Sequence, residues 1–358
     1  MLVQSFWAIE WGVRQLPGKT SVGRCSESTK SSPRGDDSCQ TRSMQNKVKD
    51  KFSGGGLCAF ALTCLLVSTS HALAQTSSAA EPASGANASA LLDKYTTLEK
   101  QLGKTAFGRP LVLESFEDTG SVTGNAYAVL DASFNTVSTT FKGPTHWCEV
   151  MILHINTKYC RATSESSSSV LKVNIGKKTP QTLKDAFALE FALRQVSASP
   201  RYLAVQLNAE KGPLGTSDYR IELQAVPLTS GKTFMHLRYA YGYGLAGRLA
   251  MQGYLATAGS GKVGFTRISG DQKQGYVGGM RGTVERNTMR YYLAIEAYLA
   301  SLSRPAAQQL DARLEHWFDA TEQFSQQLHE TDRSSYLSMK RDEYSRQQMP
   351  EKPAVPAE

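Results

Sequence analysis

Residues 219–241, YRIELQAVPLTSGKTFMHLRYAY, hold two alternating segments on either side of a short polar turn. Every second residue from Tyr219 to Ala225 is apolar or aromatic, and so is every second residue from Met235 to Tyr241. Ser230-Gly231 lies between the segments and is typical of a turn. Because the side chains of a strand point alternately to opposite faces, the pattern predicts two antiparallel strands that share one apolar face.

The same period of two continues toward the N-terminus through residues 171–175, 187–194 and 203–208. Turns that contain glycine or proline separate these segments, at residues 176–180, 199–200 and 212–215. Consecutive alternating segments joined by short turns predict an antiparallel meander whose apolar face covers a core.

Helical patterns flank the meander on both sides. Before it, we predict a short amphipathic helix that carries Leu91 to Leu102, a strand over residues 125–130, and short helices over 133–141 and 144–153. After it, we predict a helix over residues 245–254, a strand over 263–268, a long helix over 283–302 and another that carries Leu310 to Leu328. The charged residues 340–346 are expected to be solvated.

Residues 44–74 have the three parts of a secretory signal peptide. They begin with a basic stretch at Met44, continue with an apolar run over residues 57–67, and end with Ala72-Leu-Ala74 as a cleavage signal. The apolar run is about half of the ~20 residues that a spanning helix needs, so we expect no stable membrane span after cleavage. An N-terminal anchor that is never cleaved is the alternative. The expected location of the mature protein is the periplasm.

This signal peptide determines the expected organisation of the chain. Residues 1–43 precede it and are interpreted as a disordered start-site artefact. The remaining parts are a leader with a short helix (75–103), a main domain (104–303), a helical extension (304–349) and a disordered tail (350–358).

The charge balance argues against nucleic acid as a partner. The 358 residues carry a net charge of +8, but residues 1–74 contribute 9 basic and 5 acidic side chains, so the remainder has a net charge of only +4. A dedicated nucleic-acid binder concentrates Lys and Arg far more strongly than this. The content of 41% hydrophobic residues is typical of a globular protein.

Two of the six cysteines, Cys148 and Cys160, lie after the predicted cleavage site. An even pair of cysteines in an oxidising compartment favours a disulfide bond between them. Two buried free thiols are the alternative, because unpaired cysteine packs like a small hydrophobic residue. No metal site is expected, since His146 and His154 lie nearby without the spacing of zinc ligands.

No motif in the chain predicts a cofactor or a catalytic residue. Residues 242–247 match G-x-G-x-x-G, but they follow a meander and lack the acidic residue that a dinucleotide site needs about twenty positions later. The histidines are dispersed, and no G-x-S-x-G motif is present. Whether the protein is an enzyme stays open at this point, and a non-catalytic role is favoured.

The order of a strand, two short helices, a meander and a long helix resembles the START-like (helix-grip, SRPBCC) superfamily. Residues 132–137, ASFNTV, resemble the superfamily's approach to its first helix, and residues 143–148, GPTHWC, contain a tryptophan where the family commonly has one. Residues 153–160 and 281–290 resemble exported bacterial members of undefined function. The resemblance covers residues 124–302.

The resemblance implies an α+β domain in which a curved antiparallel sheet surrounds the long C-terminal helix and encloses an apolar cavity. A further C-terminal helix is added, and residues 242–277 form an insertion that is either a lid or extra packing. Such cavities bind lipids, sterols or polyketide-like molecules, so the expected partner is a hydrophobic or lipid-like small molecule. The START-like ligand-binding domain would then span residues 104–303.

The candidate ligand-binding residues are of two kinds, aromatic side chains suited to an amphipathic ligand and charged side chains at the start of the long helix. They are Trp147, Tyr239, Tyr241, Tyr254, Arg281, Glu285, Arg286, Met289, Arg290 and Tyr292. The aromatic side chains either line a pocket or belong to the core. The charged ones either anchor an anionic head group or form a structural network, with Asp218 or Glu222 as partners.

Three functions follow from these observations. The first is a periplasmic, non-catalytic binding protein for a hydrophobic or amphipathic molecule. The second is a cyclase- or hydrolase-like enzyme that uses Glu285, His154 or His236 as a general acid or base. The third is a cell-envelope scaffold whose C-terminal helix, within residues 305–349, docks a protein partner. His154 with Asn156 and Lys158 either faces a ligand or belongs to an edge strand.

Overall fold

The computed structural model describes residues 80–165, 168–255, 261–270 and 273–349. The chain divides into two compact units, and all the residues described belong to the unit that contains Ser77–Glu358. The start-site artefact, the signal peptide and the C-terminal tail predicted above lie outside the described residues.

The described elements include eight helices, ten strands and two short 3₁₀ turns. In chain order the helices and strands are α1 (Ala80–Gly103), β1 (Leu111–Asp118), β2 (Ser121–Leu130), α2 (Phe134–Phe141), α3 (Thr145–Met151), β3 (Thr157–Glu165), β4 (Ser168–Ile175), β5 (Phe187–Ser199), β6 (Tyr202–Lys211), β7 (Thr216–Pro227), β8 (Thr233–Tyr243), α4 (Leu245–Leu255), β9 (Arg267–Gly270), β10 (Lys273–Tyr276), α5 (Gly279–Ser301), α6 (Ala306–Glu322), α7 (Ser325–Leu328) and α8 (Arg333–Gln348).

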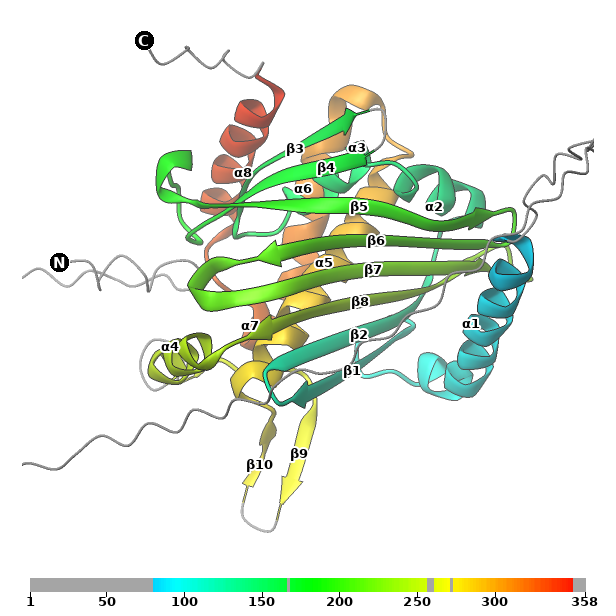
Figure 1. Ribbon diagram of the computed structural model, residues 1–358, viewed down its shortest axis with the longest axis horizontal. Coiled ribbons are helices and arrows are strands. Elements are labelled where there is room, and N and C mark those ends of the chain that lie inside the picture. Colours follow the sequence, from blue (N-terminus) through cyan, green and yellow to red (C-terminus); the bar gives the residue numbers. More distant parts are fainter. Residues whose placement is uncertain (1–79, 166–167, 256–260, 271–272, 350–358) are drawn as a thin grey trace, which may run out of the picture. The chain divides into compact units, whose positions relative to one another are not determined.

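The main sheet has eight strands in the order β1-β2-β8-β7-β6-β5-β4-β3, and every neighbouring pair is antiparallel. The predicted meander is confirmed, because β4 to β8 pair consecutively. The edge strand β1 was not predicted from the sequence, and the edge strand considered around residues 154–158 begins at Thr157 as β3. Figure 1 shows α5 crossing one face of this sheet and α1 lying across the other.

Each face of the sheet packs on its own helix. On the inner face, alternate residues such as Leu207, Leu223 and Leu237 are fully buried in one large core with α5. On the outer face, Tyr127 and Phe234 belong to a separate cluster beneath α1. The apolar inner face is therefore as predicted, and α1 covers part of the opposite face as well.

Strand β2 and helix α5 approach each other closely at Gly124. A Cβ atom added there would clash with Thr288 Oγ1 and would lie 3.3 Å from the backbone oxygen of Val284. Both of these residues belong to α5, so the absence of a side chain at Gly124 lets the long helix lie directly on the sheet.

We expect Gly124→Ala to lower the free energy of unfolding by about 1–3 kcal/mol, because overpacking forces the helix and the strand apart. Urea unfolding would measure the change. Gly143→Ala is the matched control, since nothing lies within 4 Å of a Cβ added there. Equal stability of the two variants would contradict the close approach.

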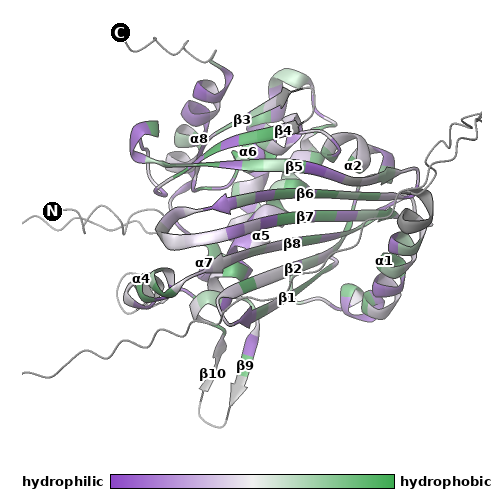
Figure 2. Cartoon of the chain, viewed as in Figure 1, coloured by the Kyte–Doolittle hydropathy of each residue, from purple (hydrophilic) through white to green (hydrophobic). Residues whose placement is uncertain are grey.

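The C-terminal part of the chain differs from the sequence-based expectation. The predicted helix to Leu328 is interrupted, because α6 ends at Glu322 and the short α7 follows. Residues 340–346 are not solvated, since Lys340 and Glu343 are fully buried where α8 packs against β3. Figure 2 shows that α8 is nonetheless largely hydrophilic, which is why its composition indicated a solvated helix.

The predicted insertion, residues 242–277, contains α4 and a hairpin. The strand expected over residues 263–268 lies instead at 267–270 as β9, and it pairs with β10 rather than with the main sheet. Within the described ranges, no helix has both the length and the apolar composition of a membrane span.

Candidate functional site

An unbroken series of aromatic rings lies between α5 and the inner face of the sheet. The His154 ring lies 5.0 Å from the Tyr291 ring of α5, and Tyr291 lies 5.3 Å from Tyr239 of β8, measured between ring centroids. Tyr239 and Tyr241 are 5.8 Å apart, and Tyr219 of β7 stacks on Tyr241 at 5.2 Å. Planar rings with polar ends suit a ligand that has an apolar body.

His154 contributes a polar group to this aromatic region. It lies in the turn between α3 and β3 and is 5% exposed. Its Nδ1 accepts a hydrogen bond from the backbone N–H of Asn156 at 3.2 Å, so the ring proton resides on Nε2. The side chain of Asn287 in α5 is a further hydrogen-bond partner of the ring. Burial, followed by the charges of Arg290 and Lys340, lowers the pKa of His154 well below its usual value, so the ring stays neutral.

Four charged side chains meet beside His154. Glu330, which follows α7, forms salt bridges to Lys178 at 2.7 Å, to Arg290 of α5 at 2.7 Å and to Lys262 at 3.0 Å. Burial alone would raise the pKa of Glu330, but the three cations together lower it to about 2. The carboxylate is therefore ionised throughout the physiological pH range. We call these four residues the Glu330 cluster.

Glu285, near the start of α5, is fully buried and forms several hydrogen bonds to neighbouring segments. Its carboxylate accepts hydrogen bonds from Ser115 Oγ of β1 at 2.5 Å, from the backbone N–H groups of Phe265 and Thr266 at 2.5 and 2.9 Å, and from Thr266 Oγ1 at 2.6 Å. Arg281 Nε donates to the same Ser115 hydroxyl at 3.1 Å. Glu285 thus connects the long helix to an edge strand and to the segment before β9.

The predicted ligand-binding residues do not all meet at one place. Tyr239 and Tyr241 belong to the ring series, and Arg290 joins the Glu330 cluster. Arg281 and Glu285 contact β1, as described above. The side chain of Tyr254 lies outside the described part of the structure.

The remaining candidates pack elsewhere around α5. Arg286 donates to the backbone oxygen of Val263 at 3.2 Å, and Met289 is fully buried. The Tyr292 hydroxyl donates to Glu296 at 3.0 Å, on the side of α5 toward α6. Trp147 is fully buried, and its indole N–H donates to the backbone oxygen of Phe141 at 3.0 Å.

The two acidic partners considered for the charged candidates lie elsewhere. Glu222 forms a salt bridge with Arg238 at 3.4 Å, and Asp218 accepts a hydrogen bond from Ser217. The Glu330 cluster was missed because Lys178, Lys262 and Glu330 lie in three separate connecting segments, without a local pattern that relates them.

The three residues considered for acid–base catalysis are not brought together. His236 lies on the outer face of the sheet, where its ring stacks on Tyr127 at 4.4 Å and its Nε2 lies 2.9 Å from Asn125 Oδ1. Burial lowers the pKa of His236 to about 4. Glu285 and His154 are on the opposite side, and the oxygens of Glu285 are already occupied by hydrogen bonds.

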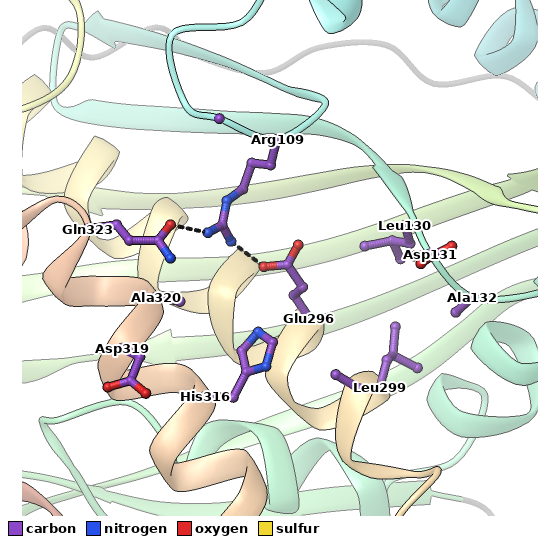
Figure 3. Close-up of a pocket in the computed structure, with 12 residues that line it drawn as sticks. Arg109, Leu130, Asp131, Ala132, Glu296, Leu299, His316, Asp319, Ala320 and Gln323 are labelled. Atoms are coloured by element: carbon purple, nitrogen blue, oxygen red, sulfur yellow. Dashed lines mark hydrogen bonds and ion pairs between the residues drawn. The ribbon is translucent and has the colours of Figure 1, made fainter.

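A separate groove with a volume of about 640 Å³ lies on the α6 side of α5. Figure 3 shows Arg109 between Glu296 of α5 and Gln323 at the end of α6, with hydrogen bonds to both. His316 and Asp319 lie on the α6 wall of the groove. This groove could not be predicted from the sequence, since Arg109 meets α5 and α6 only in the folded chain.

A smaller groove of about 310 Å³ lies under α1 on the outer face of the sheet. Tyr127 and His236 line it together with Lys94 of α1. In the part of the chain that the structure describes, no three His, Cys, Asp or Glu side chains are grouped as a metal site requires.

The two cysteines lie beside the core that supports His154. Cys148 of α3 and Cys160 of β3 form a disulfide bond, with their Cα atoms 5.1 Å apart. The predicted disulfide is confirmed. The bond ties α3 to the edge strand, and the turn that carries His154 lies between the two cysteines.

No protein-family model matches the chain, and neither does any curated protein. Among solved structures, human StAR-related lipid transfer protein 5 is 9% identical, with 50% of this chain and 92% of that chain covered and a TM-score of 0.28. A point mutant of norcoclaurine synthase from Thalictrum flavum, in complex with a transition-state analogue, is 14% identical, with 42% of this chain and 91% of that chain covered and a TM-score of 0.26.

The fold follows from the arrangement of the elements themselves. Two strands, two short helices and a six-stranded antiparallel run lead to one long helix that lies on the inner face of the sheet. This is the arrangement that the resemblance implied, with α4, the β9–β10 hairpin and the helices α6 to α8 as additions. The described chain therefore has an α+β START-like, helix-grip fold.

Proposed function

We propose that the protein binds a hydrophobic or amphipathic small molecule between α5 and the inner face of β5–β8, without transforming it chemically. The observation that carries the proposal is the aromatic series itself, in which the rings of His154, Tyr291 and Tyr239 lie in sequence between α5 and the sheet. A ligand oxygen that accepts a hydrogen bond from His154 or from a tyrosine hydroxyl would stabilise the complex by about 0.5–1.5 kcal/mol.

The periplasm is the proposed location. The signal peptide predicted over residues 44–74 supports it, and so does the disulfide bond between Cys148 and Cys160, since such bonds persist in oxidising compartments. Two observations support binding rather than acid–base catalysis: His236 lies on the outer face of the sheet, and the oxygens of Glu285 already accept four hydrogen bonds.

The proposal is tested by titrating the protein purified from a periplasmic preparation with Nile red, a neutral dye whose carbonyl oxygen can accept a hydrogen bond from His154. We expect saturable binding with one dye per protein, and His154→Phe should weaken it about tenfold because the hydrogen bond is lost while a flat ring remains. Fluorescence titration gives the dissociation constants.

His236→Phe is the matched control, because it removes a second buried, neutral histidine from the opposite face of the sheet. Its dissociation constant should equal that of the unmodified protein. Absence of saturable binding, or equal losses in the two variants, would refute the proposed site. Native mass spectrometry followed by organic extraction of the periplasmic protein would then identify the natural ligand.

A further inference from the structure

The Glu330 cluster holds more positive than negative charge. Lys178 follows β4, Lys262 precedes β9, Arg290 lies in α5 and Glu330 follows α7, so four separate segments converge on one point. Each of the three cations forms a salt bridge to the same carboxylate. The four groups together have a net charge of +2.

This surplus charge is largely removed from water. The side chains of Arg290, Lys178 and Glu330 are 1%, 7% and 8% exposed, and only Lys262, at 27%, reaches solvent. Burial of an uncompensated charge is strongly unfavourable, because the attraction to a partner no longer offsets the loss of hydration. A cluster of this kind is therefore more stable when a further anion joins it.

Two cations of the cluster also donate to neutral acceptors, which leave the net charge unchanged: Arg290 donates to Asn287 Oδ1 at 3.3 Å and Lys262 to the backbone oxygen of His329 at 3.2 Å. Lys178 and Arg290 both bind Glu330 Oε1, while Lys262 binds Oε2. Arg290 Nε is buried and has no hydrogen-bond partner in the described part of the chain. The other buried carboxylate of α5, that of Glu285, is committed to Ser115, Phe265 and Thr266 and does not supply the missing acceptor.

The cluster lies at one end of the aromatic series. Arg290 directly precedes Tyr291, whose ring lies 5.0 Å from that of His154. The charges of Arg290 and Lys178 both act on the His154 ring, so the cluster lies close to the end of the aromatic series. A ligand whose polar head group binds the cluster would therefore have its apolar part beside the aromatic rings.

We infer that the ligand is an amphiphile with an anionic head group, a carboxylate or a phosphate, which binds Lys178, Lys262 and Arg290 while its apolar body lies along Tyr291 and Tyr239. The inference rests on the proposed function and names the chemical class of that ligand. Arginine and lysine suit both head groups, because guanidinium forks and ammonium groups form charge-assisted hydrogen bonds to either.

The test compares four amphiphiles with the same twelve-carbon chain: dodecanoate, dodecyl phosphate, dodecan-1-ol and dodecyltrimethylammonium. Isothermal titration of the full-length exported protein, below the micellar concentrations, gives each dissociation constant. We expect at least one anion to bind about tenfold or more tightly than the alcohol, and the trimethylammonium compound to bind most weakly. The tighter anion identifies the head group.

The outcomes separate this inference from the proposed function. If the alcohol binds as tightly as both anions, the site is apolar and the inference is overturned while the proposed function stands. If none of the four compounds binds, the proposed function itself fails.

Two variants test the residues named. Lys178→Met and the partly exposed Lys262→Met should each weaken binding of the anion about tenfold and leave the alcohol unchanged. Lys232→Met is the control, since this lysine is 49% exposed and pairs only with Asp131 in the described structure. Parallel losses for the anion and the alcohol, or an equal effect of the control, would overturn the assignment of the head-group site.

Glu330→Gln provides an independent check in the opposite direction. The substitution removes the carboxylate that competes with the head group and raises the net charge of the cluster from +2 to +3. We expect the anion to bind more tightly by about tenfold and to raise the melting temperature of this variant more than that of the unmodified protein. Weaker binding of the anion would contradict a role for Glu330 as its competitor.

Discussion

Glu343→Gln is expected to lower the free energy of unfolding by about 3–5 kcal/mol, the cost of breaking a buried ion pair. Glu343 Oε1 lies 2.9 Å from Lys158 Nζ of β3, and Oε2 lies 2.8 Å from Lys340 Nζ in its own helix. All three side chains are at most 2% exposed. Without the carboxylate, two ammonium groups are left in the interior with no counter-charge, and α8 loses its attachment to the edge strand. Urea unfolding at neutral pH measures the effect.

The loss of stability in Glu343→Gln should be smaller at high pH than at neutral pH. Burial lowers the pKa of Lys340 to about 8 from its usual 10.5, although Glu343 opposes the shift. Between these two values the unfolded chain binds more protons than the folded chain, so stability rises with pH. In Glu343→Gln the folded lysines lose their protons more readily still. The difference in free energy of unfolding between the unmodified protein and Glu343→Gln should therefore become smaller as the pH is raised from 7 to about 10.

Glu315→Gln is the control for this prediction, because it also removes one carboxylate from a salt bridge of the C-terminal helices. The Glu315 side chain is 49% exposed and lies 3.7 Å from Arg333. Exposed pairs of this kind contribute little, so we expect a change within about 0.5 kcal/mol. A similar loss in both variants, or a deficit in Glu343→Gln that does not change with pH, would contradict a buried triad.

The strands of the sheet could be predicted where every second residue is apolar and packs into the core. The strands β4 to β8 alternate because one face of each covers the core, and that period is visible in the chain itself. Strand β1 lacks the period, since Ser115 faces the interior while Phe116 is 58% exposed. The polar residue is tolerated inside because Glu285 of α5 accepts its hydrogen bond, and this partner is 170 residues away.

The same reasoning explains the error at α8. Lys340 and Glu343 have the composition of a solvated helix, and the sequence around them contains nothing that indicates burial. Their partners are Lys158 Nζ and the backbone oxygens of His154 and Thr157, all contributed by the edge strand β3 and the turn before it. Local patterns reveal amphipathic faces, whereas a buried polar contact between distant segments leaves no periodic signal.

The candidate site was predictable to a similar extent. Tyr239 and Tyr241 could be placed on the inner face, because they continue the alternation of β8. The approach of His154 and Tyr291 could not, since neither belongs to an alternating strand and their rings meet only after α3 and α5 have packed together. The Glu330 cluster forms only when four segments converge, so it could not be predicted from local sequence patterns.

Reduction of the Cys148–Cys160 bond is expected to lower the free energy of unfolding by about 3 kcal/mol. The two cysteines are 12 residues apart, and closure of a loop of this length restricts the unfolded chain by about that amount. The bond also holds β3, an edge strand that pairs with β4 alone, against α3. Urea unfolding with and without a thiol reductant measures the effect.

The double variant Cys148→Ala/Cys160→Ala supplies the control for that measurement. Alanine is preferable to serine, because both positions are buried and a hydroxyl there would need a partner. The variant should be about as unstable as the reduced protein, and the reductant should not change it further. If the reductant leaves the unmodified protein equally stable, the bond contributes nothing to the fold. A loss in the reduced protein alone would contradict the prediction, because the free thiols, and not the absence of the bond, would then destabilise the fold.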